Sequence, residues 1–358
     1  MLFPYTYVPH QMEKMQTFID FIFFEVWCKA SLNVPYSLDL FNANPELHEV
    51  MTVFHYDDTK GAEFFSGHVE RIYGLFAALS AAQIEQFREW YRANNDIEKV
   101  CANDPTTLVT RYTDFPVGLE DARDQLKSFF KNLYSHLDPA VLKAKIGEID
   151  DHYDKAFLSA NRRGICPFCG IGDIKGPHHT KREAYDHYLP KALYPFNSIN
   201  FRNLAPACHG CNSTYKQAKD PAHNAAGRRK AFYPYAAPGP AIQIAVALRH
   251  LDIDRLTPED ITLQFGPAAI NEEIDTWKDV YGIEERYKAK LCGESGGQSW
   301  LNQMLDEWKE LGRDPNDFLA TLARHTQKRP YADCNFLKKA LLEAYHAATV
   351  LNCTQPVA

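Results

Sequence analysis

Two Cys-x-x-C pairs place the strongest constraint on how this chain of 358 residues can fold. The first pair is Cys166 and Cys169, the second is Cys208 and Cys211, and 38 residues lie between the pairs. Four thiolates in this pattern can surround one tetrahedral zinc ion, and in a cytosolic protein the pattern favours zinc over disulfides. A redox-active Cys-x-x-C is the competing interpretation, but neither pair has the strand-and-helix context of a thioredoxin. We therefore predict a structural zinc site without an open coordination position.

The other cysteines show no such pairing. They are scattered through predicted helices, and we expect buried free thiols at Cys28, Cys101, Cys292, Cys334 and Cys353. The most apolar early stretch, residues 17–27, is interrupted by Asp20 and Glu25, which indicates a buried amphipathic helix rather than a signal peptide or membrane span. The protein is therefore expected in the cytoplasm.

Charge is distributed unevenly along the chain. The whole sequence carries a net charge of −7, yet residues 156–231 hold 12 basic and 4 acidic side chains, a local net charge of +8. A basic centre between acidic flanks indicates a local site for a polyanion such as nucleic acid. The hydrophobic fraction of 45% supplies ample material for a core and argues against a disordered chain.

The periodicity of apolar residues predicts three regions. Residues 1–155 form a helical N-terminal region, and residues 236–358 form a mainly helical C-terminal region with two short strands. Between them, residues 156–235 lose the helical period and become rich in Gly, Pro, Asn and His. A segment of this kind buries little core by itself, so we expect a small module that zinc stabilises.

The expected elements can be given by their ranges. The helical patterns of the N-terminal region cover residues 11–30, 68–94, 120–137 and 135–158, and the tract 31–66 is expected to be irregular. Residues 233–241 (YPYAAPGPA) are interpreted as a linker. The C-terminal region is expected to contain strands at 242–248 and 260–265, followed by helices at about 269–293, 298–311, 314–326 and 334–351.

The stretch EAYDHYLPK (183–191) lies between the cysteine pairs and holds Asp186 next to His187. Neighbours in an extended segment point to opposite faces, so both can reach one phosphate only where a strand ends or bulges. A second strand is predicted from NLAPAC (203–208). A helix is predicted from CNSTYKQAK (211–219), with Asn212 on its first turn and Lys216 one turn later on the same face.

In this order, the residues resemble the HNH nuclease family with its ββα-metal fold and a four-cysteine zinc frame. The resemblance covers about one seventh of the chain and rests on CPFCG (166–170), DHYLPK (186–191), NLAPACHGCN (203–212) and Lys216. It implies an α+β, mainly helical fold in which a zinc-braced HNH module lies between helical regions. The segments FFKNLY (129–134) and FYPY (232–235) are similar to flanking segments of bacterial HNH proteins found in anti-phage defence loci.

The resemblance also implies a role for each site residue. His187 would be the general base that deprotonates the attacking water, a task that suits a neutral imidazole near pH 7. Asn203 would steady the loop and the orientation of His187 by hydrogen bonding. Asp186 and Asn212 would ligate one catalytic cation, Mg²⁺ or Mn²⁺. At the third position of the motif this chain has Asn212 rather than His. A neutral amide is a poorer ligand than imidazole for the softer metals.

Several residues around this set are candidates for secondary roles. Six basic side chains are predicted to contact phosphates of nucleic acid: Arg182, Lys191, Lys216, Arg228, Arg229 and Lys230. His178 and His179 are interpreted as a solvated loop or as support for the site, with an extension of the active site as the alternative. His209 is expected to face solvent, with replacement of a cysteine as metal ligand as the alternative.

The resemblance thus implies an endonuclease that hydrolyses DNA phosphodiester bonds in bacterial anti-phage defence and uses catalytic Mg²⁺ or Mn²⁺, beside the structural Zn²⁺ that the cysteine spacing predicts. DNA is the expected partner, RNA stays open as a substrate, and the resemblance implies a protein partner such as an ATPase from the same operon, without a membrane partner. The alternative is a non-catalytic, zinc-dependent module that binds nucleic acid or protein, because zinc ribbons share the cysteine spacing. The nuclease is favoured by four residues that a zinc ribbon does not need: Asp186, His187, Asn203 and Asn212.

Overall fold

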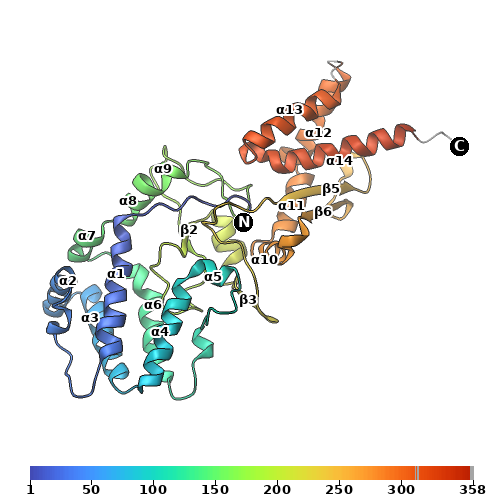
Figure 1. The fold of residues 1–358 in the computed structure, drawn as a ribbon. Coiled ribbons are helices and arrows are strands. Elements are labelled where there is room, and N and C mark those ends of the chain that lie inside the picture. The colour runs from blue at the N-terminus through green and yellow to red at the C-terminus, as the bar shows by residue number, and fades with distance from the viewer. Residues whose placement is uncertain (311, 313, 355–358) are drawn as a thin grey trace.

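The computed structural model of the chain describes residues 1–310, 312 and 314–354, with side chains up to residue 350. Its helices and strands form an elongated molecule in which the N-terminal helices lie at one end and the C-terminal helices at the other (Figure 1). The segment that contains both cysteine pairs lies between these ends. Buried apolar side chains form a continuous core that includes residues of all three parts. The division at residues 155 and 235 stays a prediction.

The N-terminal end is an assembly of helices, as predicted. Its α-helices are α1 (Lys14–Phe21), α2 (Pro45–Tyr56), α3 (Lys60–Ala77), α4 (Ala81–Asn95), α5 (Ile97–Cys101), α6 (Glu120–Leu133), α7 (Ala140–Ile146), α8 (Ile149–Asp151) and α9 (Leu158–Ala160). Helix α3 packs against α6, and the buried ring of Trp27 donates its Nε1–H to the carbonyl of Val69 at 3.0 Å. Large apolar side chains on these inner faces supply most of the driving force for this assembly.

The expectation of irregular structure over residues 31–66 is wrong for its second half. Helix α2 begins at Pro45, and α3 begins at Lys60. Asn44 caps α2 by accepting the Leu47 amide at 3.1 Å, and Thr59 caps α3 by accepting the Ala62 amide at 3.3 Å. Asn44, Pro45 and Thr59 thus start helices, since Asn and Thr favour the N-cap and Pro favours the first turn.

Two three-residue strands form the centre of the middle segment. Strand β1 (Tyr185–His187) pairs antiparallel with β2 (Leu204–Pro206), with Asp186 opposite Ala205. A π-helical segment, Gly210–Lys216, follows and begins inside the second cysteine pair. Both strands and the helix are where the sequence predicts them. A small hairpin of β3 (His223–Asn224) and β4 (Gly227–Arg228) was not predicted.

The C-terminal end has a two-stranded sheet covered by helices. Strand β5 (Gln243–Leu248) pairs antiparallel with β6 (Ile261–Gly266), and α14 packs on β5. The helices are α10 (Asn271–Tyr281), α11 (Ile283–Cys292), α12 (Ser299–Lys309), α13 (Pro315–Lys328) and α14 (Asn335–Thr354). The single helix expected at 269–293 is divided at Gly282, where φ is +59° and a β-carbon would lie 2.4 Å from the Tyr215 ring. Only glycine fits both constraints.

The predicted linker at residues 233–241 is partly wrong. Tyr233 and Tyr235 are buried, and the hydroxyl of Tyr235 donates to the carbonyl of Leu204 in β2. Tyr5 is buried beside them and donates its hydroxyl to the Pro206 carbonyl at 2.8 Å. Aromatic side chains therefore anchor the first part of this segment to the β1–β2 pair.

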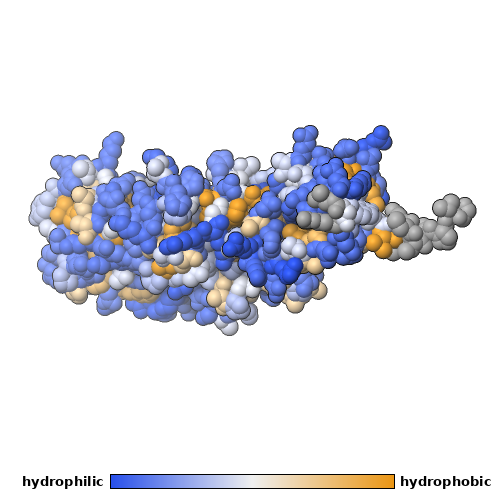
Figure 2. Space-filling view, turned by 90° about the horizontal axis from the view of Figure 1, so that it is seen from above, coloured by the Kyte–Doolittle hydropathy of each residue, from blue (hydrophilic) through white to orange (hydrophobic). Residues whose placement is uncertain are grey.

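The outer surface is mainly polar. In the view of Figure 2, hydrophilic residues cover most of the face, and the hydrophobic ones are scattered between them. Across the described residues, we find no helix that combines the length and the apolar content that crossing a membrane requires.

Candidate functional site

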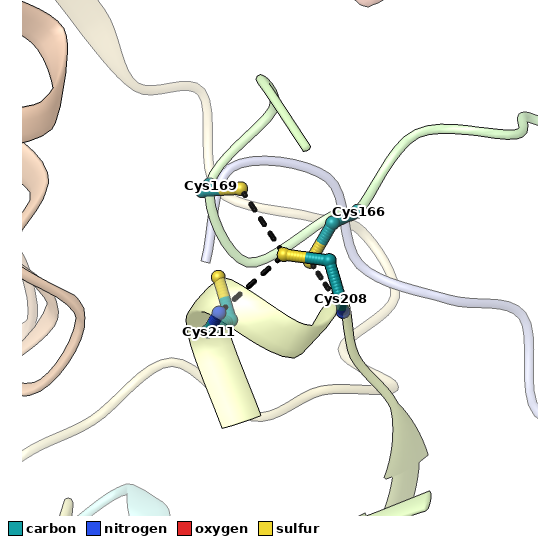
Figure 3. Close-up of side chains that lie close together, drawn as sticks. All are labelled: Cys166, Cys169, Cys208 and Cys211. Atoms are coloured by element: carbon teal, nitrogen blue, oxygen red, sulfur yellow. Dashed lines mark hydrogen bonds between the residues drawn. The ribbon is translucent and has the colours of Figure 1, made fainter. Parts of the chain in front are cut away.

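The four cysteines of the two pairs come together at one point, as predicted. Their sulfur atoms all lie within 4.8 Å of one another, with 3.9 Å between Cys169 and Cys208, and all four side chains are buried (Figure 3). A tetrahedral zinc ion with Zn–S bonds of about 2.3 Å requires sulfur atoms roughly 3.8 Å apart. The cluster therefore fits a metal ion such as zinc, and it provides thiolates only, which suits a structural site.

Backbone amides and glycines shape this cluster. The amide of Gly172 points at the sulfur of Cys169 at 3.4 Å, and the amide of Cys211 points at the sulfur of Cys208 at 3.4 Å. Gly170 has a φ of +71°, and a β-carbon there would lie 2.6 Å from Leu2. The first pair is therefore folded around a turn that a larger residue would strain.

Electrostatics also favour a cation at this point. Burial raises the pKa of Cys166 well above its ordinary value, whereas hydrogen bonds from the neighbouring cysteines lower the pKa of Cys169. Four thiolates so close together repel each other, and a divalent ion relieves this repulsion. Such a centre has a net charge of −2. The guanidinium of Arg286 on α11 compensates part of that charge by donating to the Cys211 sulfur at 3.2 Å.

The C-terminal helices hold the first cysteine pair through its backbone carbonyls. Trp277 on α10 donates its Nε1–H to the carbonyl of Phe168 at 2.5 Å, and Tyr287 on α11 donates its hydroxyl to the carbonyl of Cys169 at 2.8 Å. All of these groups are buried. The cysteine cluster is therefore supported from the C-terminal side of the molecule.

Asp186, in the middle of β1, is buried and paired with a buried cation. The Nζ of Lys216 lies 2.9 Å from Oδ1 of Asp186 and donates to the His187 carbonyl at 2.9 Å, and the two charged side chains are 4% and 1% exposed. The other carboxylate oxygen, Oδ2, is buried and has no hydrogen-bond partner among the described residues. Burial raises the pKa of Asp186, and Lys216 opposes that effect. An unpaired buried carboxylate oxygen indicates a position where a cation or proton donor can bind.

His187, at the end of β1, is held in one orientation. Its Nε2 lies 2.9 Å from the Ser198 carbonyl, an acceptor only, so Nε2 carries the proton and Nδ1 keeps its lone pair. Burial, together with the charge of Lys191, lowers the pKa of His187 to about 3. The imidazole is therefore neutral at pH 7, with one basic nitrogen that makes no hydrogen bond among the described residues.

Asn203 closes the loop that joins the two strands. Its Oδ1 accepts the Leu189 amide at 2.7 Å, and its Nδ2 donates to the carbonyls of Leu189 and Asn197 at 3.0 and 3.2 Å. The side chain is fully buried. Through these contacts Asn203 joins both ends of the loop, and its role in catalysis stays a prediction. The loop is also attached to α4, because Asn197 donates to the Asn94 carbonyl at 3.2 Å.

Asn212 lies one turn before Lys216 on the helical segment. Residues one turn apart share a helix face, so Asn212 is on the side of the helix that contacts Asp186. Its side chain is half-buried, and within the described part of the chain its side-chain amide makes no hydrogen bond. Asp186, His187, Asn203 and Asn212 thus come from adjoining elements.

The predicted phosphate-contacting residues have unequal positions. Arg182 pairs with Asp150, Arg229 pairs with Asp279 at 2.7 Å, and Arg228 donates to the Thr107 carbonyl at 2.9 Å. Burial of Lys216 does not support the predicted phosphate contact, because its ammonium is enclosed against β1. Half-buried Lys191 and exposed Lys230 are the two of the six without such partners among the described side chains. The three histidines considered for secondary roles, His178, His179 and His209, are exposed.

Three contacts of the site were not predicted from the sequence. They are the ion pair of Lys216 with Asp186, the Ser198 carbonyl on His187, and the ring of Tyr134 packed against His187. Tyr134 belongs to the segment FFKNLY, which was noted only for its similarity to flanking segments. Lys216 lies 30 residues after Asp186, and Ser198 lies 11 residues after His187. Tyr134, by contrast, comes from the N-terminal region.

Comparison with known proteins finds two that share a stretch with this chain. Protein ea31 of Escherichia phage lambda is 40% identical over 62 residues, which is 17% of this chain and 18% of that protein. Septu protein PtuB of Bacillus thuringiensis is 32% identical over 75 residues, 20% of this chain and 28% of that protein. The chain thus spans less than a third of either relative. No family model matches it. No solved structure matches it either.

Proposed function

We propose that the protein is a metal-dependent endonuclease of the HNH type, which hydrolyses DNA phosphodiester bonds and acts in bacterial anti-phage defence. The observation that carries the proposal is the pair at the end of β1. Within the part of the chain that the structure describes, Asp186 keeps a buried oxygen without a partner, and the next residue, His187, keeps a basic nitrogen that makes no hydrogen bond. A zinc-binding module without catalysis has no need of either group. The similarity to Septu protein PtuB supports the defence role.

Asp186 Oδ2 and the amide oxygen of Asn212 would hold the catalytic cation. Carboxylate and amide oxygens are hard ligands that suit Mg²⁺ or Mn²⁺. When bound, such a cation stabilises the negative charge that develops on the phosphate and on the leaving oxygen. Among the described residues, the cysteine cluster is the one group of three or more His, Cys, Asp or Glu side chains placed to hold a metal. Water and the DNA phosphate would therefore complete the catalytic site.

His187 would take the proton of the attacking water at Nδ1. The Ser198 carbonyl holds Nε2–H, so it fixes the tautomer and favours the imidazolium that forms when Nδ1 accepts the proton. Asn203 acts indirectly, because it fixes the loop that carries Ser198 by bonding Leu189 at one end and Asn197 next to Ser198 at the other. Lys216 fixes the Asp186 carboxylate relative to the His187 backbone, because its ammonium donates a hydrogen bond to each.

The proposal is tested by metal titration of plasmid nicking. Supercoiled DNA is incubated with wild type, Asp186→Asn or Asn212→Ala over a range of Mg²⁺ and Mn²⁺ concentrations. We expect wild type to require the metal, and both variants to lose rate by about 100-fold or more at low metal and to recover partly as metal rises. Asp173→Asn, which changes an exposed carboxylate of the same segment, should behave as wild type.

Removing the charge of Asp186 alone leaves the Lys216 ammonium buried without its partner, which can cost about 3–5 kcal/mol of stability. The double variant Asp186→Asn/Lys216→Met therefore serves as a second test, since it removes both buried charges. Zinc content and thermal unfolding show whether each variant is folded. Metal-independent cutting, or wild-type rates in both folded Asp186 variants, would contradict the proposed site.

A further inference from the structure

The N-terminal region contributes a residue to the candidate active site. Tyr134 follows the last residue of α6, and its ring stands edge-to-face against the imidazole of His187, with ring centroids 5.0 Å apart and an interplanar angle of 83°. The ring is half-buried, and its hydroxyl makes no hydrogen bond among the described residues. Together with the Ser198 carbonyl, Tyr134 limits the rotation of the imidazole.

Lys191 occupies the face of the same ring. Its Nζ lies 5.6 Å from the centroid of Tyr134, and the side chain is half-buried. Within the described part of the chain, Lys191 has no carboxylate partner. A cation–π contact orients an ammonium group without neutralising it, so the charge of Lys191 remains available to an anion.

The surroundings of the other basic residues single out this lysine. Arg182 and Arg229 are neutralised by carboxylates, and Lys216 is enclosed with Asp186. Lys191 is four residues beyond His187, at the start of the loop that leaves β1. Of the cations without a carboxylate partner among the described residues, it is thus the one closest in sequence to the proposed general base, and an aromatic ring holds it there.

We propose that Tyr134 is a positioning residue that completes the nuclease site from the N-terminal region. It fixes the imidazole of His187 and holds the Lys191 ammonium for a phosphate of the DNA backbone. The inference rests on the proposed function, and it adds that residues 156–235 do not contain the whole site. The ring, and not the hydroxyl, performs both tasks, because both contacts are made to the ring.

Three variants and a control test this arrangement in the full chain. Tyr134→Phe keeps the ring, Tyr134→Leu removes it, and Lys191→Met removes the ammonium. The control, Lys127→Met, removes a second lysine that lies over a tyrosine ring, at 5.7 Å from the centroid of Tyr112. Zinc content and thermal unfolding are compared first, so that only folded variants are used.

The first readout does not depend on cutting. Diethyl pyrocarbonate acylates accessible neutral imidazoles, and mass spectrometry measures its rate at His187 without DNA or added metal. We expect acylation to be several-fold faster in Tyr134→Leu and unchanged in Tyr134→Phe. The role of the ring at His187 would be overturned if wild type and Tyr134→Leu were acylated at the same rate. It would also be overturned if Tyr134→Phe were acylated as fast as a faster Tyr134→Leu.

The second readout is the salt dependence of DNA binding. Lys191→Met should reduce the slope of log K against log salt by about one unit, the effect of one lost phosphate contact, while Lys127→Met leaves it unchanged. Tyr134→Leu should bind nearly as well at low salt and yet nick about 10- to 100-fold more slowly in single turnover. An unchanged slope in Lys191→Met would overturn the phosphate contact.

The two proposals fail in different ways. A wild-type protein that never cuts DNA, but in which His187 is shielded by Tyr134, contradicts the proposed function and leaves the contact standing. A wild type that cuts, together with a folded Tyr134→Leu that cuts equally fast, contradicts the inference about Tyr134 and leaves the nuclease standing.

Discussion

The cysteine cluster and the Asp186–His187 strand belong to the same small segment, yet opposite ends of the molecule support them. The C-terminal helices hold the cluster through Trp277, Tyr287 and Arg286. The N-terminal region supports the strand and its loop, through Tyr134 against His187 and through α4. Figure 1 shows this middle segment between the two groups of helices.

The two sites also differ in what they leave unpaired. The cluster presents four buried thiols to each other, so a metal ion would satisfy it without any outside ligand. Among the described residues, the strand leaves Asp186 Oδ2 without a partner and His187 with a free Nδ1. Because folded proteins rarely leave buried polar atoms unpaired, this difference is what our proposal uses to assign a structural role to the cluster and a catalytic role to the strand.

The largest expected effect breaks the cysteine cluster. Cys166→Ser or Cys211→Ser should abolish zinc binding and unfold the middle segment, since structural zinc contributes roughly 10 kcal/mol or more to such modules. Zinc stoichiometry and hydrogen exchange over residues 161–220 measure the effect. Cys292→Ser, which changes a half-exposed thiol outside the cluster, should keep both zinc and fold. A stably folded protein without zinc, or a folded Cys166→Ser protein with native exchange, would contradict the structural role.

A smaller effect sharpens the part that the C-terminal helices play. Arg286→Met removes a hydrogen bond to a charged sulfur, worth about 1.5–3 kcal/mol, so zinc should leave about 10- to 100-fold faster in the presence of a chromogenic chelator. The pKa of Arg286 is consistent with this pairing: burial disfavours its charge, but Cys169 and Cys211 outweigh burial and raise the pKa. Arg255→Met changes an exposed arginine and serves as control. If Arg286→Met released zinc at the rate of wild type, Arg286 would not stabilise the metal centre.

The sequence predicted those features that depend on local pattern. The two Cys pairs, the strands at Asp186 and Leu204 and the helix after Cys211 lie where expected, because spacing and turn residues determine them locally. Zinc itself and the catalytic roles stay predictions.

Features that depend on distant contacts were missed. Tyr134 meets His187 across 53 positions of sequence, and no local pattern indicates this contact. Tyr233 and Tyr235 belong to a proline-rich tract that resembles a linker, and only the tertiary structure reveals their burial. The predicted phosphate contact of Lys216 lacks support for a similar reason, since its burial depends on the approach of β1.

The smallest expected effect uses pH to distinguish the two sites. The pKa of His187 is about 3 in the folded protein, below the value near 6.5 in the unfolded chain. Between these two pKa values the unfolded chain binds a proton at His187 that the folded protein does not bind, so the free energy of unfolding falls as the pH decreases from about 6.5 towards 3. Relative to pH 7, wild type should lose about 1–2 kcal/mol more than His187→Gln at pH 5. Denaturant unfolding at the two pH values measures the difference, with His178→Gln, an exposed histidine, as control. Parallel losses in wild type and His187→Gln would contradict an imidazole that stays neutral in the folded protein.

The central claim is that His187 is the base of a DNA-cleaving site, and the single-turnover nicking rate of His187→Ala tests it most directly. Enzyme is present in excess, so that all plasmid is bound, at saturating Mg²⁺, and zinc content and DNA affinity are measured on the same samples. We expect a loss of about 10²- to 10⁴-fold in rate with zinc and DNA affinity retained, and wild-type rates for His179→Ala, a change in the exposed loop. If folded His187→Ala protein nicks DNA as fast as wild type, the strand is structural and the nuclease account is wrong.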